Sequence, residues 1–418
     1  GFALGNKKIG GAITMKCKKV KLKKGYVWEC YKEGPADPRT GKRRQIRRRG
    51  KTQREAKDRV EDAINIIKMD GIDPHVSKKL PFSVVAKKWL DVYKSTGLKP
   101  GSVRVRKKEV KIINRYFGKT PIINITHSMY QDMLVHMSKA GNKGKPYSKN
   151  TILGVNTCAN MIFEYAKRNK WIKDNPRDGA TIPKKKITVE DLKENKIEET
   201  YFERDELKEF FNVLIKYGKE YDKEWFYTLV FTGMRSGELL ALEKSDLNFE
   251  NNTIWIGKTL YNESNNIRKY DILPTKTNVA RIINVEKSIM VMLKRLIVKN
   301  DENKLKNRLL VDGFHDSDFV FQHTNGYPFM TQNIRQRMDR LMRLTTIKKH
   351  LTPHSFRHTH ISMLTEAGVD LPTIMKRVGH VDPETTLKVY THVTNKMQEK
   401  SVKNLSAKFN DLLAKITF

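Results

Sequence analysis

The sequence predicts a protein of several domains that is mainly helical and contains small antiparallel β-sheets. The chain has 418 residues, more than a single domain of ordinary size. Most of its apolar residues recur at helical spacing. Sections of different composition are separated by polar breaks that contain glycine and proline. The predicted sections are residues 1–78, 79–182 and 200–392, with a linker over 183–199 and a tail over 393–418.

The composition favours nucleic acid as the partner. Lysine and arginine number 82 against 46 acidic residues, which gives a formal charge of +36 and a pI near 9.9. Such a field attracts polyanions. An anionic membrane is disfavoured, because the chain has no run of about 18 apolar residues and no signal peptide. We therefore expect a soluble, cytoplasmic protein.

The cysteines are few. Cys17, Cys30 and Cys158 include no CxxC pair, so we expect no disulfide framework, no zinc site built on cysteine, and a reducing compartment.

The first section predicts a small sheet with one helix. "GYVWECYKEG" and "KRRQIRRRG" are typical of two strands around the turn-rich "GPADPRTG". "TQREAKDRVEDAINIIKMDG" predicts a helix capped by Thr52 and Glu55 and ended by Gly71. A solvated basic arm is the alternative. We expect the sheet to grip a DNA duplex through the arginines of the second strand: Arg43, Arg44, Arg47, Arg48 and Arg49.

The second section predicts a bundle of about four helices, separated by "GLKPGS", "GNKGKPYS" and "KDNPRDG". Helix starts present backbone N–H groups and cations to phosphates. The candidate DNA contacts at two such starts are Lys99, Ser102, Arg104 and Lys149. The predicted apolar faces are Val85, Trp89, Val92 and Tyr93; Val110, Ile113 and Phe117; and Val155, Ala159, Ile162, Phe163 and Ala166.

The first polar motif of the third section is "FTGMRSGELLALEK". Gly233 and Gly237 flank Arg235, which we place at a helix start where anions are favoured. Glu238 would orient the guanidinium; the alternative is that Arg235 serves only this ion pair. "YDILPTKTNVARIINV" predicts two strands joined by a tight turn with Lys276 at its tip, a position that is more often idle.

"LTPHSFRHTHISMLTEAG" predicts a helix that starts at Thr352 and Pro353 and ends at Gly368. His354 and Arg357 share one face of it, which suits phosphate binding and proton exchange. A metal site is disfavoured, since no HExxH glutamate and no carboxylate cluster accompany the histidines.

The next motif ends in a tyrosine. His380 follows Gly379 at a helix end, and Asp382 and Pro383 start the helix that carries Tyr390. Alone, such a tyrosine is typical of packing.

Taken in order, "TGMRSGELLALEKSDL", "PTKTNVARIINV", "TPHSFRHTHISMLTEAG" and "VGHVDPETTLKVYTH" resemble the catalytic motifs of the tyrosine recombinase family, the integrases of temperate phages and conjugative transposons. The resemblance runs over the whole chain. The first section resembles the arm-site DNA-binding domain of these integrases, the second their core-site domain, and the third their α+β catalytic domain.

This resemblance implies catalysis by a 3′-phosphotyrosine intermediate, without metal, ATP or another cofactor. Tyr390 would be the nucleophile, Lys276 the acid and His354 a proton-transfer partner, with Glu238 in support. The residues that the resemblance implies bind the phosphate are Arg235, Arg357 and His380.

The implied partners are double-stranded DNA with core and arm attachment sites, three further protomers in a homotetramer, an excisionase and a host DNA-bending protein. In the tail, Val402, Leu405, Phe409 and Leu412 recur at helical spacing. The resemblance favours docking of this tail on a neighbouring protomer; packing on its own domain is the alternative.

Two other functions stay open at this point. A type IB topoisomerase would use a similar set of residues to nick and reseal one duplex, although the separate basic first section favours a recombinase. A protein that only binds DNA would not need the complete set from Arg235 to Tyr390.

Overall fold

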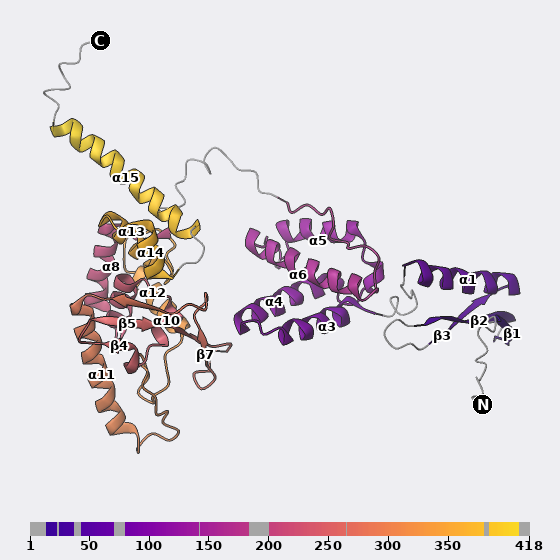
Figure 1. The fold of residues 1–418 in the computed structure, drawn as a ribbon, viewed down its shortest axis with the longest axis horizontal. Helices are drawn as coiled ribbons and strands as arrows, with labels where there is room; N and C mark the ends of the chain where they lie inside the picture. Colours follow the sequence, from indigo (N-terminus) through magenta and orange to yellow (C-terminus); the bar gives the residue numbers. More distant parts are fainter. Residues whose placement is uncertain are drawn as a thin grey trace, which may run out of the picture. The chain divides into compact units, whose positions relative to one another are not determined.

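The computed structural model describes residues 14–22, 25–36, 43–70, 80–141, 143–183, 200–264, 266–379 and 384–408. The chain divides into two compact units, residues 1–186 and 187–418 (Figure 1). The predicted fold class, mainly helical with small antiparallel sheets, is confirmed. The predicted linker lies almost wholly outside the described residues, as does Gly71.

The N-terminal part of the first unit is a three-stranded sheet covered by one helix. Strands β1 (Lys16–Lys21), β2 (Tyr26–Ala36) and β3 (Arg43–Gly50) pair antiparallel in that order, and helix α1 (Gln53–Asp70) packs on one face. The Thr52 hydroxyl accepts from the Glu55 backbone N–H at 3.1 Å, as the predicted cap requires. The sequence analysis missed β1, because the lysine-rich "KCKKVK" lacks a clear apolar alternation.

The structure contains one disulfide, where the sequence analysis expected no disulfide framework. Cys17 on β1 and Cys30 on β2 lie directly opposite one another, and a disulfide joins them with a Cα–Cα distance of 4.1 Å. The pairing register of the sheet creates this proximity, and the spacing of cysteines along the chain does not reveal it. Cys158 is a buried free thiol.

The rest of the first unit contains four helices among its described residues, as predicted. They are α3 (Phe82–Ser95), α4 (Pro100–Phe117), α5 (His127–Lys139) and α6 (Lys149–Arg168), with the short 3₁₀ helix η1 (Ile122–Asn124) before α5. The predicted apolar faces form its core, with one correction: Val92 is 48% exposed. Val92 lies in the last turn of α3, where Tyr93 takes the core-facing place.

The second unit surrounds a large aromatic core. Phe356 stacks on Phe202 at 5.2 Å and lies 5.4 Å from both Phe210 and Phe226, so the helix that carries it is held from several sides. Its helices are α8 (Arg204–Tyr217), α9 (Asp222–Thr232), α10 (Ser236–Leu240), α11 (Lys287–Asn307), α12 (Thr331–Met342), α13 (Ser355–Glu366), α14 (Leu371–Val378) and α15 (Glu384–Lys408), with the 3₁₀ helix η3 (Lys244–Asp246).

The described strands of the second unit form two small sheets. The two strands predicted around Lys276 are present, but they belong to different sheets and do not form a hairpin. Strands β4 (Leu247–Asn248), β5 (Thr253–Ile256) and β8 (Arg281–Asn284) form one sheet; β6 (Lys258–Tyr261) and β7 (Asp271–Pro274) form the other. The β7 and β8 strands therefore do not pair with each other. The chain leaves the first sheet at Gly257 and returns next to it, where the Thr275 N–H donates to the Gly257 carbonyl at 3.3 Å.

Two helix boundaries differ from the predicted ones. Helix α13 begins at Ser355 with His354 as its N-cap, two residues later than predicted, because residues 353–354 form a turn instead. Its predicted end at Gly368 is confirmed, with φ at +79°. Helix α15 continues past residue 392 and extends away from the rest of its unit (Figure 1), so the predicted tail begins inside this helix. The tail residues Val402, Leu405, Phe409 and Leu412 lie outside the described side chains.

We predict that Asp222→Asn destabilises the second unit. Asp222 is fully buried and accepts hydrogen bonds from Arg337 at 3.0 Å and Arg340 at 2.9 Å, which ties α9 to α12. Removing its charge leaves two cations without their partner, at a cost of about 3 kcal/mol. Urea unfolding of the full chain measures this loss.

The control is Glu220→Gln, since Glu220 and Lys299 form an ion pair in which both side chains are more than half exposed. We expect a change below about 1 kcal/mol there. Equal effects of the two substitutions would contradict the assigned role of Asp222.

Candidate active site

Arg235 lies at a helix start, as predicted, where it is the N-cap of α10. Helix α9 ends at Gly233 in the left-handed region, with φ at +66°, and α10 begins after Arg235. Glu238 accepts from the Arg235 backbone N–H at 3.1 Å and from its Nη1 at 2.8 Å. The Arg235 side chain remains 21% exposed while Glu238 is almost fully buried. The ion pair therefore orients a guanidinium that solvent still reaches.

A second arginine, Arg281 at the start of β8, binds the same carboxylate. Its Nη2 donates to Glu238 Oε2 at 2.7 Å. Burial alone would raise the pKa of the Glu238 carboxyl, but the hydrogen bond and charge of Arg281, with the charge of Arg235, hold that pKa below its ordinary value. Glu238 is thus an anion inside the protein.

Arg357 bridges the ends of two helices. Its Nη1 donates to the Gly233 carbonyl, at the end of α9, at 2.8 Å, and its Nη2 donates to the Val378 carbonyl at the end of α14. Carbonyl groups at helix C-termini carry partial negative charge, which suits a cation. Arg357 is fully buried. Burial, followed by the nearby Arg235 charge, lowers the pKa of Arg357 from its ordinary value, but an arginine stays charged at neutral pH.

His354 is a neutral imidazole beside these cations. Burial, together with the charges of His358, Arg357, Arg235 and Lys276, lowers its pKa to about 4. The His354 and His358 rings lie 4.8 Å apart, edge to face. The structure therefore brings Arg235, Arg357 and His354 together. Lys276 lies close enough for its charge to lower the pKa of His354.

Lys276 lies in the turn that connects β7 to β8. The Asn278 N–H donates to the Thr275 carbonyl at 2.9 Å, and the Thr275 hydroxyl donates to the Val279 carbonyl at 2.9 Å. Because the two flanking strands belong to different sheets, both sheets fix the ends of this turn.

Among the described residues, Tyr390 is a predicted catalytic residue that no hydrogen bond joins to the cluster. Tyr390 is half-buried on α15 and packs against a small apolar cluster that includes Ile361 and Val378. His380 belongs to residues 380–383, which lie outside the described part of the chain.

The sequence analysis missed two residues that support the cluster. Arg281 contacts Glu238, and Arg377 donates to His360 Nε2 at 2.9 Å and to the Phe231 carbonyl at 3.3 Å. One pattern could have identified Arg281. Arg281 points to the same, buried side of β8 as Ile283, so a charged residue occupies a position where an apolar one is usual.

Two other expectations concern metals and membranes. In the described ranges, histidine, cysteine and carboxylate side chains form no group of three or more suited to a metal ion. No described helix is both long and apolar enough to cross a bilayer.

The candidate DNA-binding arginines of β3 divide between the two faces of the sheet. Arg47 and Arg49 lie on the open face and donate to Glu29, a buried carboxylate on β2, at 3.3 and 2.8 Å. Arg48 pairs with Cys30, a core residue, and so belongs to the face that α1 covers. Arg43 begins the strand, and the Arg44 side chain lies outside the described ones.

The candidate contacts of the bundle lie toward two different ends. Arg115 of α4 donates to the Tyr147 hydroxyl just before α6, whereas Arg106 contacts the Gly154 carbonyl further along α6. Helices α4 and α6 therefore run antiparallel. The start of α4, with Lys99, Ser102 and Arg104, lies toward the opposite end of this helix pair from Lys149.

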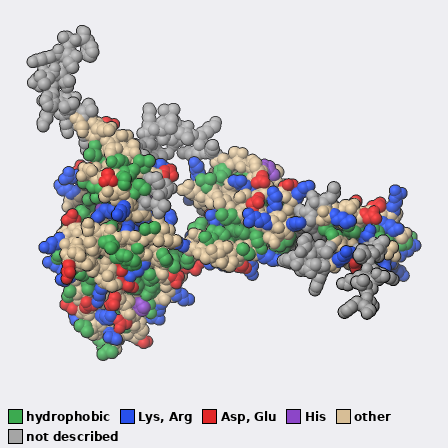
Figure 2. Space-filling view, viewed as in Figure 1, with side chains coloured by type: hydrophobic (Ala, Val, Ile, Leu, Met, Phe, Trp, Pro, Cys, Tyr) green, Lys and Arg blue, Asp and Glu red, His purple; other side chains and the backbone are tan. Residues whose placement is uncertain are grey.

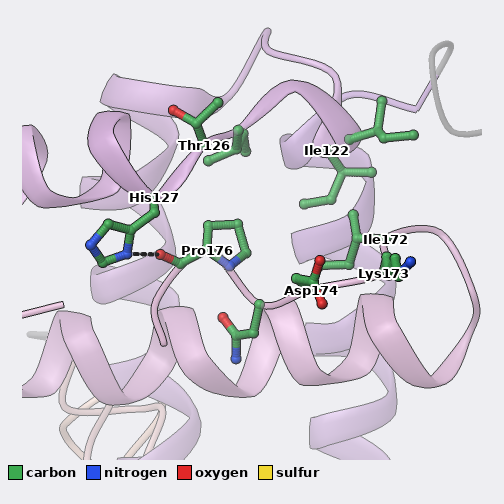
Figure 3. A pocket seen from close by; sticks show the side chains of 10 residues that line it. Ile122, Thr126, His127, Ile172, Lys173, Asp174 and Pro176 are labelled. Carbon is green, nitrogen blue, oxygen red and sulfur yellow. Dashed lines mark hydrogen bonds between the residues drawn. The ribbon is translucent and has the colours of Figure 1, made fainter. Parts of the chain in front are cut away.

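The surface charge and the pocket of the helical bundle do not indicate a further functional site. Figure 2 shows lysine and arginine side chains spread over the visible face of both units. A pocket between Ile122 and Pro176 is lined by His127, whose Nδ1 lies 3.1 Å from the Pro176 carbonyl oxygen (Figure 3). This pocket belongs to the first unit, whereas the arginine cluster belongs to the second.

We predict that the second unit loses stability as the pH falls from 6.5 to 5. Burial lowers the pKa of His354 and His358 to about 4 and that of His360 to about 3, from an ordinary value of 6.5. The unfolded chain therefore binds more protons in this range, so the free energy of unfolding falls with falling pH, by up to about 1.4 kcal/mol per pH unit for each imidazole.

Urea unfolding of the full chain between pH 7 and 5 tests this prediction. In His358→Asn, which removes one of the three imidazoles, the slope should decrease by about one proton. A free energy of unfolding that stays constant over this range would contradict the buried, neutral state of these histidines.

Comparison with known proteins places this cluster in a family. Residues 200–397 match the phage integrase family, and residues 82–138 match the phage integrase N-terminal SAM-like domain. The chain is 30% identical over 334 residues to the prophage ps2 probable integrase of Lactococcus lactis, a match that covers 78% of this chain and 83% of that protein.

Two solved structures have a similar fold. The Tn1549 transposon integrase in complex with a circular intermediate DNA is 21% identical, with a TM-score of 0.57 over 77% of this chain and 99% of that one. A lambda integrase tetramer bound to a Holliday junction is 15% identical, with a TM-score of 0.53 over 86% of this chain and 92% of that one. On the sequence matches, the chain belongs to the phage integrase family of tyrosine recombinases, the site-specific integrases of phages and conjugative transposons.

Proposed function

We propose that this integrase cuts and rejoins DNA through Tyr390, in the bacterial cytoplasm, to insert and excise a mobile element. The Tyr390 oxygen attacks a backbone phosphorus, the bond from phosphorus to the 5′-oxygen breaks, and a 3′-phosphotyrosine forms. The 5′-oxygen takes a proton from Lys276. A 5′-hydroxyl of the partner strand reverses the step and joins the two DNA molecules without ATP.

The observation that carries this proposal is the gathering of cations around one buried carboxylate. Glu238 orients Arg235, whose side chain is still partly exposed to solvent. Arg357 is buried nearby, and its guanidinium donates to two backbone carbonyls. Negative charge that develops on the phosphate oxygens during attack is stabilised by such preorganised cations. His380 would add a hydrogen bond to the same phosphate. No step needs a metal or another cofactor.

His354 suits the proton transfer at the tyrosine. Its lowered pKa keeps the imidazole neutral at neutral pH, so the ring can accept the proton that the Tyr390 hydroxyl releases. Lys276 keeps its place through a turn held at both ends by strands. The acid and the base are thus carried by different elements.

The domain roles form part of the proposal. Residues 1–78 would bind arm sites, residues 79–182 core sites, and residues 200–392 would carry the chemistry. A homotetramer would hold the two duplexes, which the lambda integrase tetramer bound to a Holliday junction supports. Residues 393–418 would contact a neighbouring protomer. An excisionase and a host DNA-bending protein would set the direction of recombination.

A type IB topoisomerase is the second candidate, because it would use the same chemistry. Its activity, however, needs no defined pair of sites.

We predict that wild-type protein forms a covalent complex with a nicked duplex that copies the DNA at the element's end, and that Tyr390→Phe does not. A denaturing gel detects the complex, which should persist in EDTA. The control is Tyr217→Phe, since Tyr217 is exposed at the end of α8. A band with Tyr390→Phe, or one lost in EDTA, would refute the assigned chemistry.

We also predict different effects for the arginines of β3. Replacing Arg47 and Arg49 with alanine should weaken duplex binding and reduce the salt dependence of log K by about 0.9 for each lost phosphate contact. The matched control is Arg48→Ala, because Arg48 lies on the face that α1 covers. Fluorescence anisotropy at several salt concentrations measures both slopes, and a larger effect of Arg48→Ala would exclude the open face as the binding surface.

A further inference from the structure

Arg281 is a buried charged residue of the second unit that has no part in the proposed chemistry. It is the first residue of β8, directly after the turn that carries Lys276, and its side chain is only 7% exposed. Burying an ion pair is seldom a net gain in stability compared with apolar packing. Its contacts indicate another reason for its presence.

One side of the Arg281 guanidinium holds the carboxylate that orients Arg235. Nη2 donates to Glu238 Oε2 at 2.7 Å, and Nη1 lies 3.5 Å from Glu238 Oε1. The same two oxygens accept from the backbone and side chain of Arg235. Without Arg281, Glu238 would keep one cation instead of two and would lose the contact that fixes its plane.

The other side of Arg281 holds the end of α14. Its Nε donates to the Arg377 carbonyl at 2.9 Å, and the next carbonyl, of Val378, accepts from Arg357. Gly379 lies so close that a Cβ there would be 3.0 Å from Arg281 Nη1 and 3.2 Å from Cδ. This contact explains the glycine, together with its left-handed φ of +68°. His380 follows directly in the sequence.

We propose that Arg281 is a positioning residue that fixes Arg235, Arg357 and the Lys276 turn relative to one another around the reacting phosphate. A planar guanidinium donates to a carboxylate and a carbonyl in different directions at once, which a lysine ammonium on a flexible stem does not do in a fixed geometry. The inference rests on the proposed function, since it concerns the same phosphate.

The test compares two nicked duplexes that copy the DNA at the element's end. One has an ordinary phosphate at the cleaved position, and the other has a methylphosphonate, in which a methyl group replaces one charged oxygen. The methylphosphonate develops less negative charge during attack, so its cleavage depends less on well-placed arginines. The measured quantity is the rate at which the covalent protein–DNA complex forms.

We expect Arg281→Ala to lose 100-fold or more on the phosphate, in the range of about 10²–10³ found when an oxyanion-stabilising group is removed. On the methylphosphonate the loss should be at least ten times smaller, as for Arg235→Ala. Arg281→Lys keeps the buried charge and should behave in the same way, so it replaces Arg281→Ala if that variant does not fold.

The control is Arg337→Ala, which breaks the ion pair with Asp222 elsewhere in the unit. A purely structural change should slow both substrates equally. Equal losses for both Arg281 variants, or no loss, would overturn the positioning role. These outcomes are distinct from a failure of the proposed function, which would appear as a covalent complex that forms without Tyr390.

Discussion

The organisation of the catalytic unit depends on Arg357, a buried guanidinium that donates to carbonyls at the ends of α9 and α14. A charge without solvent is costly unless its hydrogen bonds are satisfied, so these two helix ends must stay in place for the unit to fold. Both helices end in left-handed glycines, Gly233 and Gly379, which turn the chain away and leave the last carbonyls accessible. The same arrangement concentrates positive charge where a DNA phosphate would supply the missing negative charge. In our proposal, stability and phosphate chemistry therefore use one set of contacts.

Glu238 orients the arginine side chains of this cluster. As the buried carboxylate shared by Arg235 and Arg281, it links the start of α10 to the start of β8. Through Arg281 it is also connected to the end of α14, and so to the carbonyl that holds Arg357. The crossing of the chain between two small sheets sets the Lys276 turn beside this network. Elements far apart in the sequence therefore converge through side-chain contacts.

The N-terminal sheet repeats this use of a buried acid among exposed cations. Glu29 holds Arg47 and Arg49 on the open face and lies 3.8 Å from Lys18. Holding long side chains in place reduces the conformational entropy that DNA binding would otherwise cost. The covered face is apolar and includes the disulfide between Cys17 and Cys30. In both units, an acidic residue that binds no DNA in our proposal arranges the basic ones that would.

The sequence by itself determined the fold class, the four-helix bundle, the cap at Thr52 and the order of motifs from Arg235 to Tyr390. These features depend on local periodicity, capping and residue type, which neighbouring residues largely decide. Only the tertiary structure decided that β7 and β8 lie in different sheets, that Arg48 and not Arg47 lies on the face that α1 covers, and that Cys17 meets Cys30. It alone identified Arg281 and Arg377 as supports of the cluster. Each of these depends on strand register or on contacts between distant segments, and the local pattern along a chain does not encode which segments meet.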